Sequence, residues 1–334
     1  MKYKIFAVLV LSVLVLNLRA STFADSAVKK AGANDLVSFL PASDGVAIVD
    51  VKRFFGDVLP KLLSSNQTMM SKLTGEVDKF QQESGIDIRQ FEYLAAGTTT
   101  RKVGEKKYEL DPVVIARGQA SATSLIDAAK RRPNAKFTEE RFGERTIYIF
   151  SGHNVGGGNV QTKSGDVVAV TQIDTMTIAF GSLERVRQTL EGKSKVGSDL
   201  TSLLVGNPAA VTSFAAKLPP GMRSFIPLDN DELGKNIDSI QYVYGDADVA
   251  NENATVHMAA RTQGAAQAKS LHETLEGLQM VGKAFLGGSK SADKQVYSRM
   301  IQNAKFTQRA NEVILDLAVP QSDIDILVSS LKSK

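Results

Sequence analysis

The chain has 334 residues, of which 43% are hydrophobic and 23% are charged, with a formal net charge of +4. These values are typical of a globular protein long enough for about two domains, and they exclude a chain that is disordered throughout. The absence of cysteine excludes disulfides, thiolate metal sites, cysteine nucleophiles and the lipidated cysteine of a bacterial lipoprotein.

Residues 1–24 have the pattern of a secretory signal peptide. Lys2 and Lys4 precede a mainly apolar run over residues 5–18, and Thr22-Phe23-Ala24 offers small residues at the cleavage positions. The run is shorter than the ~20 residues that a membrane span needs, and no later segment is apolar enough. We therefore expect a periplasmic or secreted bacterial protein without stable membrane insertion after signal removal. A retained N-terminal anchor is the alternative.

The mature chain has little basic surface for nucleic acid. Cleavage removes Lys2, Lys4 and Arg19 but no acidic residue, so the remaining chain is nearly neutral. Its basic clusters are short, and none forms a long stripe with interleaved aromatic residues. Nucleic acid is therefore not an expected partner.

The elements before residue 90 follow from apolar spacing and from turn residues. The order of expected elements is a buried strand over 46–51, a helix over 52–63 that Pro60 disturbs, and a helix over 67–84 that ends at Gly85.

One pentapeptide, Asn134-Ala135-Lys136-Phe137-Thr138, recurs letter for letter as Asn303-Ala304-Lys305-Phe306-Thr307. Each copy follows a strand with a Tyr, a strand ending in Arg and an Ala-rich helix start, and each begins a hairpin. We therefore predict two related halves, residues 25–198 and 199–334. Phe137 and Phe306 are expected to be core residues of equivalent strands.

The order of elements within each half predicts the fold class. The first half has strands over 91–97 and 112–117 joined by a charged turn, a helix over 120–131, a hairpin from 136 to 150, an additional strand pair over 167–173 and 176–180, and a helix over 183–190. The second has strands over 209–216, 240–245 and 254–261, a long helix divided at 287–289, a hairpin over 306–317 and a helix over 322–331. This order predicts an α+β fold, with two related halves and mainly antiparallel sheets covered by helices on one face.

Two segments are similar to binding loops but depart from them at a required position. Gly277 to Ala284 is close to the phosphate-binding loop, but Ala284 has no hydroxyl for magnesium and the preceding residues predict helix. Asp229 to Gly234 starts like a calcium loop, but Ile240 occupies the position of the bidentate Glu. We interpret the first as helix interior and the second as helix N-terminal acids.

The three histidines, His153, His257 and His272, show no metal-motif spacing. The Gly-rich segment around His153 is interpreted as a hairpin loop, with single-site catalysis by His153 as the alternative. No catalytic, cofactor-binding or metal-ligating residue is predicted.

Several structural turns and caps resemble those of one bacterial group. They are Leu40 to Asp44, the strand over 46–51, Ser84 to Ile88, and Phe180 to Glu184 before a helix. These segments resemble a group of uncharacterised secreted bacterial proteins that are described only as domains of unknown function and are frequent in acidobacteria-like genomes. The resemblance implies a compartment and a fold, and it carries over no catalytic residues.

The signal-peptide pattern, the predicted duplication and the lack of recognised catalytic motifs favour a non-enzymatic secreted or periplasmic protein that acts through binding. Its expected partner is an unknown protein or an apolar ligand. A carrier of an apolar small molecule or lipid, with helices over 67–84 and 265–286 covering a cavity, is the second hypothesis. A hydrolase-like enzyme of unfamiliar type is the third.

Overall fold

The computed structural model describes residues 35–104, 107–131, 136–151, 167–205, 207, 209–219, 231–288 and 291–330. The predicted signal peptide and the Gly-rich loop with His153 lie outside these ranges, as do the first two residues of the first pentapeptide copy.

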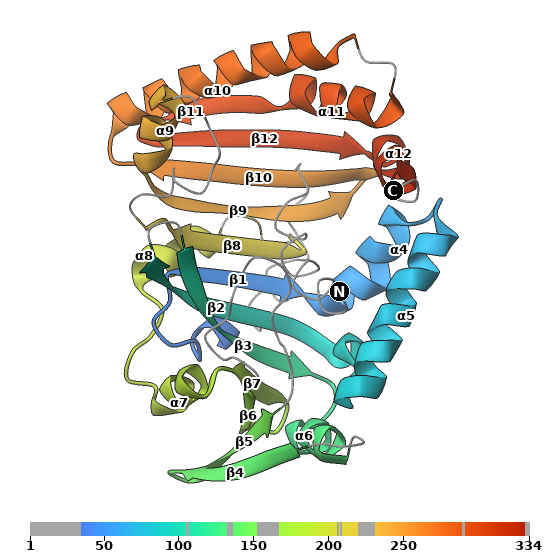
Figure 1. The fold of residues 1–334 in the computed structure, drawn as a ribbon, viewed down its shortest axis with the longest axis vertical. Helices are drawn as coiled ribbons and strands as arrows, with labels where there is room; N and C mark the ends of the chain where they lie inside the picture. Colours follow the sequence, from blue (N-terminus) through green and yellow to red (C-terminus); the bar gives the residue numbers. More distant parts are fainter. Residues whose placement is uncertain are drawn as a thin grey trace.

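All described strands join in a single antiparallel sheet, ordered β11-β12-β10-β9-β8-β1-β2-β3-β7-β6-β5-β4 (Figure 1). The first seven strands in the chain are β1 (Gly45–Asp50), β2 (Phe91–Gly104), β3 (Lys107–Gly118), β4 (Lys136–Phe142), β5 (Arg145–Ser151), β6 (Val167–Asp174) and β7 (Thr177–Gly181). The others are β8 (Thr212–Lys217), β9 (Ile240–Ala250), β10 (Asn253–Thr262), β11 (Lys305–Arg309) and β12 (Glu312–Pro320). The predicted α+β class with antiparallel pairing is confirmed.

The helical elements come from both halves of the chain. Those before residue 200 are α3 (Val51–Arg53), the π-helix η1 (Phe54–Val58), α4 (Leu59–Leu62), α5 (Gln67–Ser84), the 3-10 helix η2 (Ile88–Gln90), α6 (Ala122–Arg131), α7 (Leu183–Glu191) and α8 (Ser198–Thr201). The rest are the 3-10 helix η3 (Ser202–Val205), α9 (Asp231–Asp238), α10 (Ala265–Leu286), α11 (Ala292–Asn303) and α12 (Gln321–Ser330). None of these described helices is long and apolar enough to cross a membrane.

Local signals set the ends of the helix α5. The Asn66 side chain accepts a hydrogen bond from the Met69 backbone N–H, and Gly85 ends the helix in the left-handed region with φ of 73°. Both are standard ways to satisfy the free backbone groups of a helix terminus. The predicted bounds of this helix are confirmed.

The strands form one continuous sheet because β1 and β8 pair across the predicted boundary between the halves, with Ile48 opposite Ser213. Two correspondences support the predicted duplication. Tyr93 lies opposite Arg117 in the first half, and Tyr242 lies opposite Arg261 in the second. The two pentapeptide strands, β4 and β11, form the two opposite edges of the sheet. The duplication and its boundaries stay a prediction.

Helices lie on both faces of the first half of the sheet, whereas coverage on one face was expected. Apolar residues of α6 pack with Ile178 and Phe180 of β7, and Val186 of α7 packs with Ala179 between them. Because side chains alternate along a strand, α6 and α7 cover opposite faces. The physical reason is visible in β3, whose run Val113 to Ala116 is apolar on both faces and needs two covering layers.

In the second half, α10, α11 and α12 cover one face, as predicted. Val313 packs against α10, while Leu315 and Leu317 belong to the apolar cluster that includes Met300 of α11 and Ile324 of α12. Residues 313, 315 and 317 share one face of β12 because they alternate with outward-facing residues. The opposite face carries polar groups such as Arg261 and Glu312, whereas at β8 it packs against apolar residues of α8 and η3.

Several strands are longer than predicted. The segment over residues 98–111 was expected as mainly a charged turn, but β2 runs to Gly104 and β3 begins at Lys107. Likewise β9 runs to Ala250 through the expected polar link. In the extension of β9, Ala247 and Val249 enter apolar clusters on one face, while Asp246 and Asp248 alternate with them on the other face.

Candidate functional site

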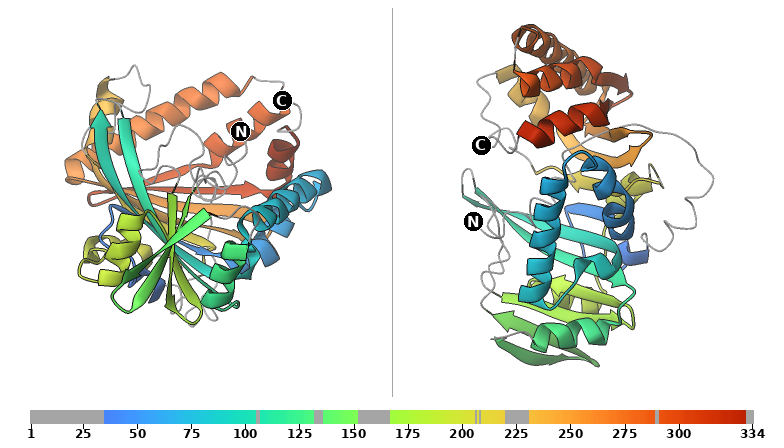
Figure 2. Two further views of the ribbon diagram at one scale, coloured as in Figure 1. Left: turned by 60° about the horizontal axis from the view of Figure 1, so that its bottom comes forward. Right: turned by 90° about the vertical axis from the view of Figure 1, so that its right-hand side faces the viewer.

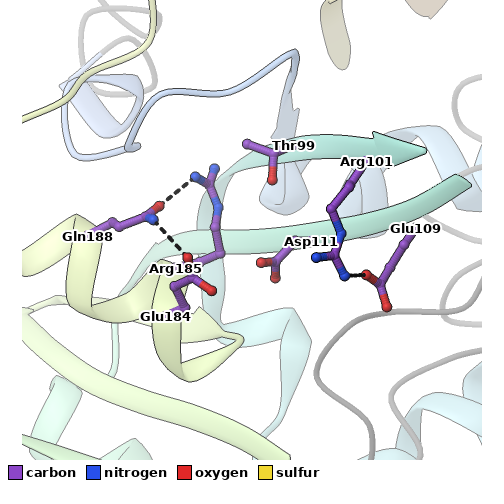
Figure 3. A pocket seen from close by; sticks show the side chains of 7 residues that line it. All are labelled: Thr99, Arg101, Glu109, Asp111, Glu184, Arg185 and Gln188. Atoms are coloured by element: carbon purple, nitrogen blue, oxygen red, sulfur yellow. Dashed lines mark hydrogen bonds and ion pairs between the residues drawn. The ribbon is translucent and has the colours of Figure 1, made fainter. Parts of the chain in front are cut away.

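A polar pocket of about 260 Å³ lies between α7 and the outer ends of β2 and β3 (Figure 3). All its lining side chains are polar or charged, and they come from these three elements: Thr99, Arg101, Glu109, Asp111, Glu184, Arg185 and Gln188. The pocket is therefore a concave site where charged groups of both signs converge.

Strand register brings four of the lining residues together. Thr99 lies opposite Asp111, and Arg101 lies opposite Glu109, in the antiparallel pair β2–β3. Because the side-chain period of a strand is two, these two pairs project from the same face of the sheet. The face is the one that α7 covers, since Val113 on it belongs to the same apolar cluster as Val186.

The other three lining residues come from the first two turns of α7. Ser182 caps this helix, and its hydroxyl accepts a hydrogen bond from the Arg185 backbone N–H. The i, i+4 spacing of Glu184 and Gln188 places them on one side of the helix, next to Arg185. The cap and the packing of Val186 hold this end of α7 over the strand ends.

Arg185 is a buried cation, only 2% exposed. Its Nη1 donates to the Ala42 carbonyl oxygen and to Gln188 Oε1, both at 2.8 Å, and its Nη2 donates to Ser43 Oγ at 2.7 Å. Its Nε N–H is buried and has no hydrogen-bond partner in the described chain. Arg185 thus ties the segment before β1 to α7 and keeps one donor for a further acceptor.

Burial lowers the pKa of the Arg185 guanidinium, and the carboxylates of Asp111, Asp44 and Glu184 oppose that shift. Asp111 is itself only 7% exposed. A buried charge is stable only with nearby charges and dipoles that replace water. The opposite charges of Arg185 and Asp111 therefore compensate each other at the buried side of the pocket.

The mouth of the pocket carries a second charged pair. Arg101 Nη2 lies 2.5 Å from Glu109 Oε2, with the Arg101 side chain largely exposed and the Glu109 side chain mostly covered. The lining as a whole has two cations and three carboxylates. It therefore suits a ligand that has a positive group for the carboxylates and an acceptor for the arginines.

Within the described residues, no group of three or more His, Cys, Asp or Glu side chains is arranged to hold a metal ion. The pocket lining also contains no histidine or lysine. The charged and polar side chains of the lining can contact a ligand through ion pairs and hydrogen bonds.

The residues considered in the sequence do not meet at this pocket. His257 lies on β10 with its Nδ1 3.0 Å from Asp316 Oδ1, and His272 lies on α10 with its Nδ1 3.6 Å from Glu276 Oε2. The segment from Gly277 to Ala284 is helix interior within α10, as predicted. Asp231 begins α9, as expected for helix N-terminal acids, while Asp229, Asn230 and His153 lie outside the described residues.

The pocket was not predicted from the sequence, because residues 98–111 were expected to form mainly a turn, whereas β2 and β3 extend through most of them. A signal was present, since Thr99 and Arg101 on one side, and Glu109 and Asp111 on the other, are each two residues apart. That spacing is typical of strand residues that share a face.

No protein-family model matches the chain, and no curated protein matches it either. Similar solved structures include three crystal forms of a protein named TP0453. Form III is 8% identical with a TM-score of 0.46, covering 88% of this chain and 97% of that chain. Form IV is 8% identical with a TM-score of 0.47, covering 88% and 96%. Form I is 7% identical with a TM-score of 0.45, covering 89% and 97%. A likeness this weak assigns no function.

Proposed function

We propose that this protein is a non-enzymatic binding protein of the periplasm or the extracellular space, and that its pocket holds a small molecule with both an ammonium and a carboxylate group. The observation that carries the proposal is the convergence of two arginines and three carboxylates in one small cavity. The location rests on the signal-like pattern of residues 1–24.

The size of the pocket limits the ligand. About 260 Å³ is the space of roughly nine water molecules at ~30 Å³ each, and it is below the usual range of drug-sized sites. A free α-amino acid or a molecule of similar size fits this space.

The charges suggest how such a ligand is oriented. Asp111 and Glu184 offer carboxylate oxygens to the ammonium group, on the side of the pocket near α7. Arg101 offers a guanidinium to the carboxylate group, because its largely exposed side chain is free to turn from Glu109. Arg185 contributes fixed positive charge and positions α7 through Ala42, Ser43 and Gln188.

A thermal-shift screen of the mature chain with each of the twenty L-α-amino acids tests this proposal. The amino acid with the largest shift is compared with the amine and the carboxylic acid that keep only its ammonium or only its carboxylate, which for L-serine are ethanolamine and 3-hydroxypropionate. We expect at least one amino acid to raise Tm, and its two single-charge probes to give weaker shifts than it does.

Other outcomes of the screen overturn the proposal. If no amino acid raises Tm at millimolar concentration, the pocket does not bind this class. A shift with oleate, unchanged in the Arg101→Gln variant, would instead favour the carrier of an apolar molecule. Hydrolysis of an ester or peptide probe would favour the enzyme alternative.

A further inference from the structure

The pocket lies at the base of a two-stranded ribbon. Strand β2 pairs with β1 only as far as Thr98, and β3 pairs with β7 only from Val113 onward. Beyond these points, no further strand of the described sheet flanks β2 and β3. Figure 2 shows these ends of the two strands side by side, extending beyond their neighbours. The pocket therefore has an inner end at the buried Asp111, next to the sheet, and an outer end at Glu109, on the ribbon.

The lining of the pocket has an excess of negative charge. Its two arginines face three carboxylates, which belong to Glu109, Asp111 and Glu184. Asp44, outside the lining, adds a carboxylate that acts on Arg185, since its charge opposes the lowering of the Arg185 pKa. An α-amino acid with a neutral side chain has no net charge and leaves this excess in place. A ligand with one additional positive group compensates the excess of the lining.

The ion pair at the mouth favours the same kind of ligand. Arg101 Nη2 lies 2.5 Å from Glu109 Oε2, and the Arg101 side chain is 65% exposed, whereas that of Glu109 is only 20% exposed. When Arg101 turns to the carboxylate of a ligand, it leaves the mostly covered Glu109 carboxylate without this cation, which is unfavourable. A second cationic group on the ligand can take the place of Arg101 beside Glu109. The exchange then leaves neither charge uncompensated.

The spacing along β3 sets the distance between the two cationic groups of such a ligand. Glu109 and Asp111 are two residues apart on one face of the strand, so their Cα atoms are roughly 7 Å apart at ~3.3 Å per residue. The α-ammonium and side-chain ammonium groups of ornithine or lysine span a similar distance. The volume of about 260 Å³ leaves room for this side chain beside the α-amino and α-carboxyl groups.

We propose, on the basis of the function proposed above, that the ligand is a basic α-amino acid such as L-lysine or L-ornithine, and that Glu109 selects it by binding the side-chain ammonium group. Asp111 and Arg101 bind the α-ammonium and α-carboxylate groups that every α-amino acid has. Arg185 keeps its place, because it is 2% exposed and donates to Ala42, Ser43 and Gln188. Glu109 is therefore the residue that determines specificity among amino acids.

Calorimetric titration of the mature chain with L-lysine and L-norleucine at low salt tests this proposal, because L-norleucine lacks only the side-chain ammonium group of L-lysine. We expect L-lysine to bind at least tenfold more tightly. Glu109→Gln should abolish the preference, while L-norleucine binds unchanged or more tightly because Arg101 is released from its ion pair. A change that only disturbed the pocket would weaken both ligands.

Glu144→Gln is the matched control, since Glu144 is an exposed glutamate in the turn between β4 and β5. It should keep the preference for L-lysine. Equal affinity for L-lysine and L-norleucine in the wild-type chain would overturn the selection by Glu109 and leave amino-acid binding in place. A preference for L-lysine that survives in Glu109→Gln would do the same.

Two further results concern the ligand class itself. Cadaverine lacks only the carboxylate of L-lysine and should bind more weakly, because it has no group for Arg101. Cadaverine binding as tight as that of L-lysine would overturn both the amino-acid ligand and its selection, in favour of a diamine. If no amino acid binds, the proposed function fails, and the role of Glu109 fails with it.

Discussion

The two halves of the sheet differ in how many of their faces are covered by long helices. In the first half, α6 lies on one face and α7 on the other, and the strand interiors are apolar on both sides. In the second half, α10 to α12 cover one face, while the opposite face carries polar groups such as Glu312, which accepts from Tyr244 at 2.8 Å and from Arg261 at 2.7 Å. The additional strand pair β6–β7 and the helix α7 make this difference.

This additional segment also creates the candidate site. Strand β7 inserts next to β3 and leads directly into α7, whose residues close the pocket over β2 and β3. In the second half β10 pairs directly with β12 instead. The candidate site therefore lies where the two halves of the sheet differ most.

The largest expected effect tests the double coverage of the first half. Ile115→Ala removes a fully buried side chain of β3, so the free energy of unfolding should fall by about 3 kcal/mol. Leu315→Ala, at a partly buried position on the covered face of β12, should cost about 1.5 kcal/mol. Urea denaturation measures both. Equal costs would contradict the difference in burial between these two positions.

The next prediction tests the equivalence of the two edge strands. Phe137 packs against Phe150 with ring centroids 5.6 Å apart, and Phe306 packs against the cluster of Leu271 and Val313. Both are half-buried, where core positions were expected, so Phe137→Ala and Phe306→Ala should each cost about 2 kcal/mol. Chemical denaturation gives the two values. A loss of stability in only one of the two variants would contradict the equivalence of β4 and β11.

Much of the local structure could be predicted from the sequence, because its signals are local. Asn66 and Gly85 mark the ends of α5, and the hairpin β4–β5 turns at Gly143, whose φ is 58°. The union of the halves through β1 and β8 could not be predicted, since nothing near Ile48 indicates which distant strand it faces. The pocket was missed for a related reason, because the alternation of Thr99 and Arg101 becomes meaningful only when Asp111 and Glu109 lie opposite.

A smaller, pH-dependent effect is expected where the halves meet. Arg53 Nη2 in α3 lies 2.6 Å from Asp248 Oδ1 in β9. Burial raises the pKa of Asp248 above its ordinary 3.8, although Arg53 opposes the shift. The contribution of Asp248 to stability is thus fully present below pH 3.8 and is lost as pH rises through the folded pKa.

The stability of the Asp248→Asn variant relative to wild type should therefore be higher at pH 7 than at pH 4. Thermal unfolding of both chains at the two pH values measures this difference. If the relative stability of the variant is instead lower at pH 7 than at pH 4, the ion pair with Arg53 outweighs the cost of burial. The contact between the halves then depends on this ion pair.

The smallest effect concerns the partly exposed pair between β4 and α7. Arg187 Nε donates to Glu140 Oε1 at 2.8 Å, and this hydrogen bond holds the pKa of Glu140 below its ordinary 4.5. The contribution of Glu140 to stability is present above pH 4.5 and is lost as the pH falls through the lower pKa that Glu140 has in the folded chain. Glu140→Gln should lower Tm slightly at pH 7 and not at pH 3. An equal decrease at both pH values would show a role independent of charge.

The most direct test of the central claim is a calorimetric titration of wild-type, Asp111→Asn, Glu184→Gln and Arg309→Gln chains with the amino acid that gives the largest thermal shift. Circular dichroism first establishes that each variant is folded. Glu184→Gln is included because Asp111 is buried, and Arg309 is an exposed control on the distant edge strand β11. The proposed site predicts at least tenfold weaker binding for Asp111→Asn and Glu184→Gln and unchanged binding for Arg309→Gln. Equal affinity in all four folded chains would contradict it.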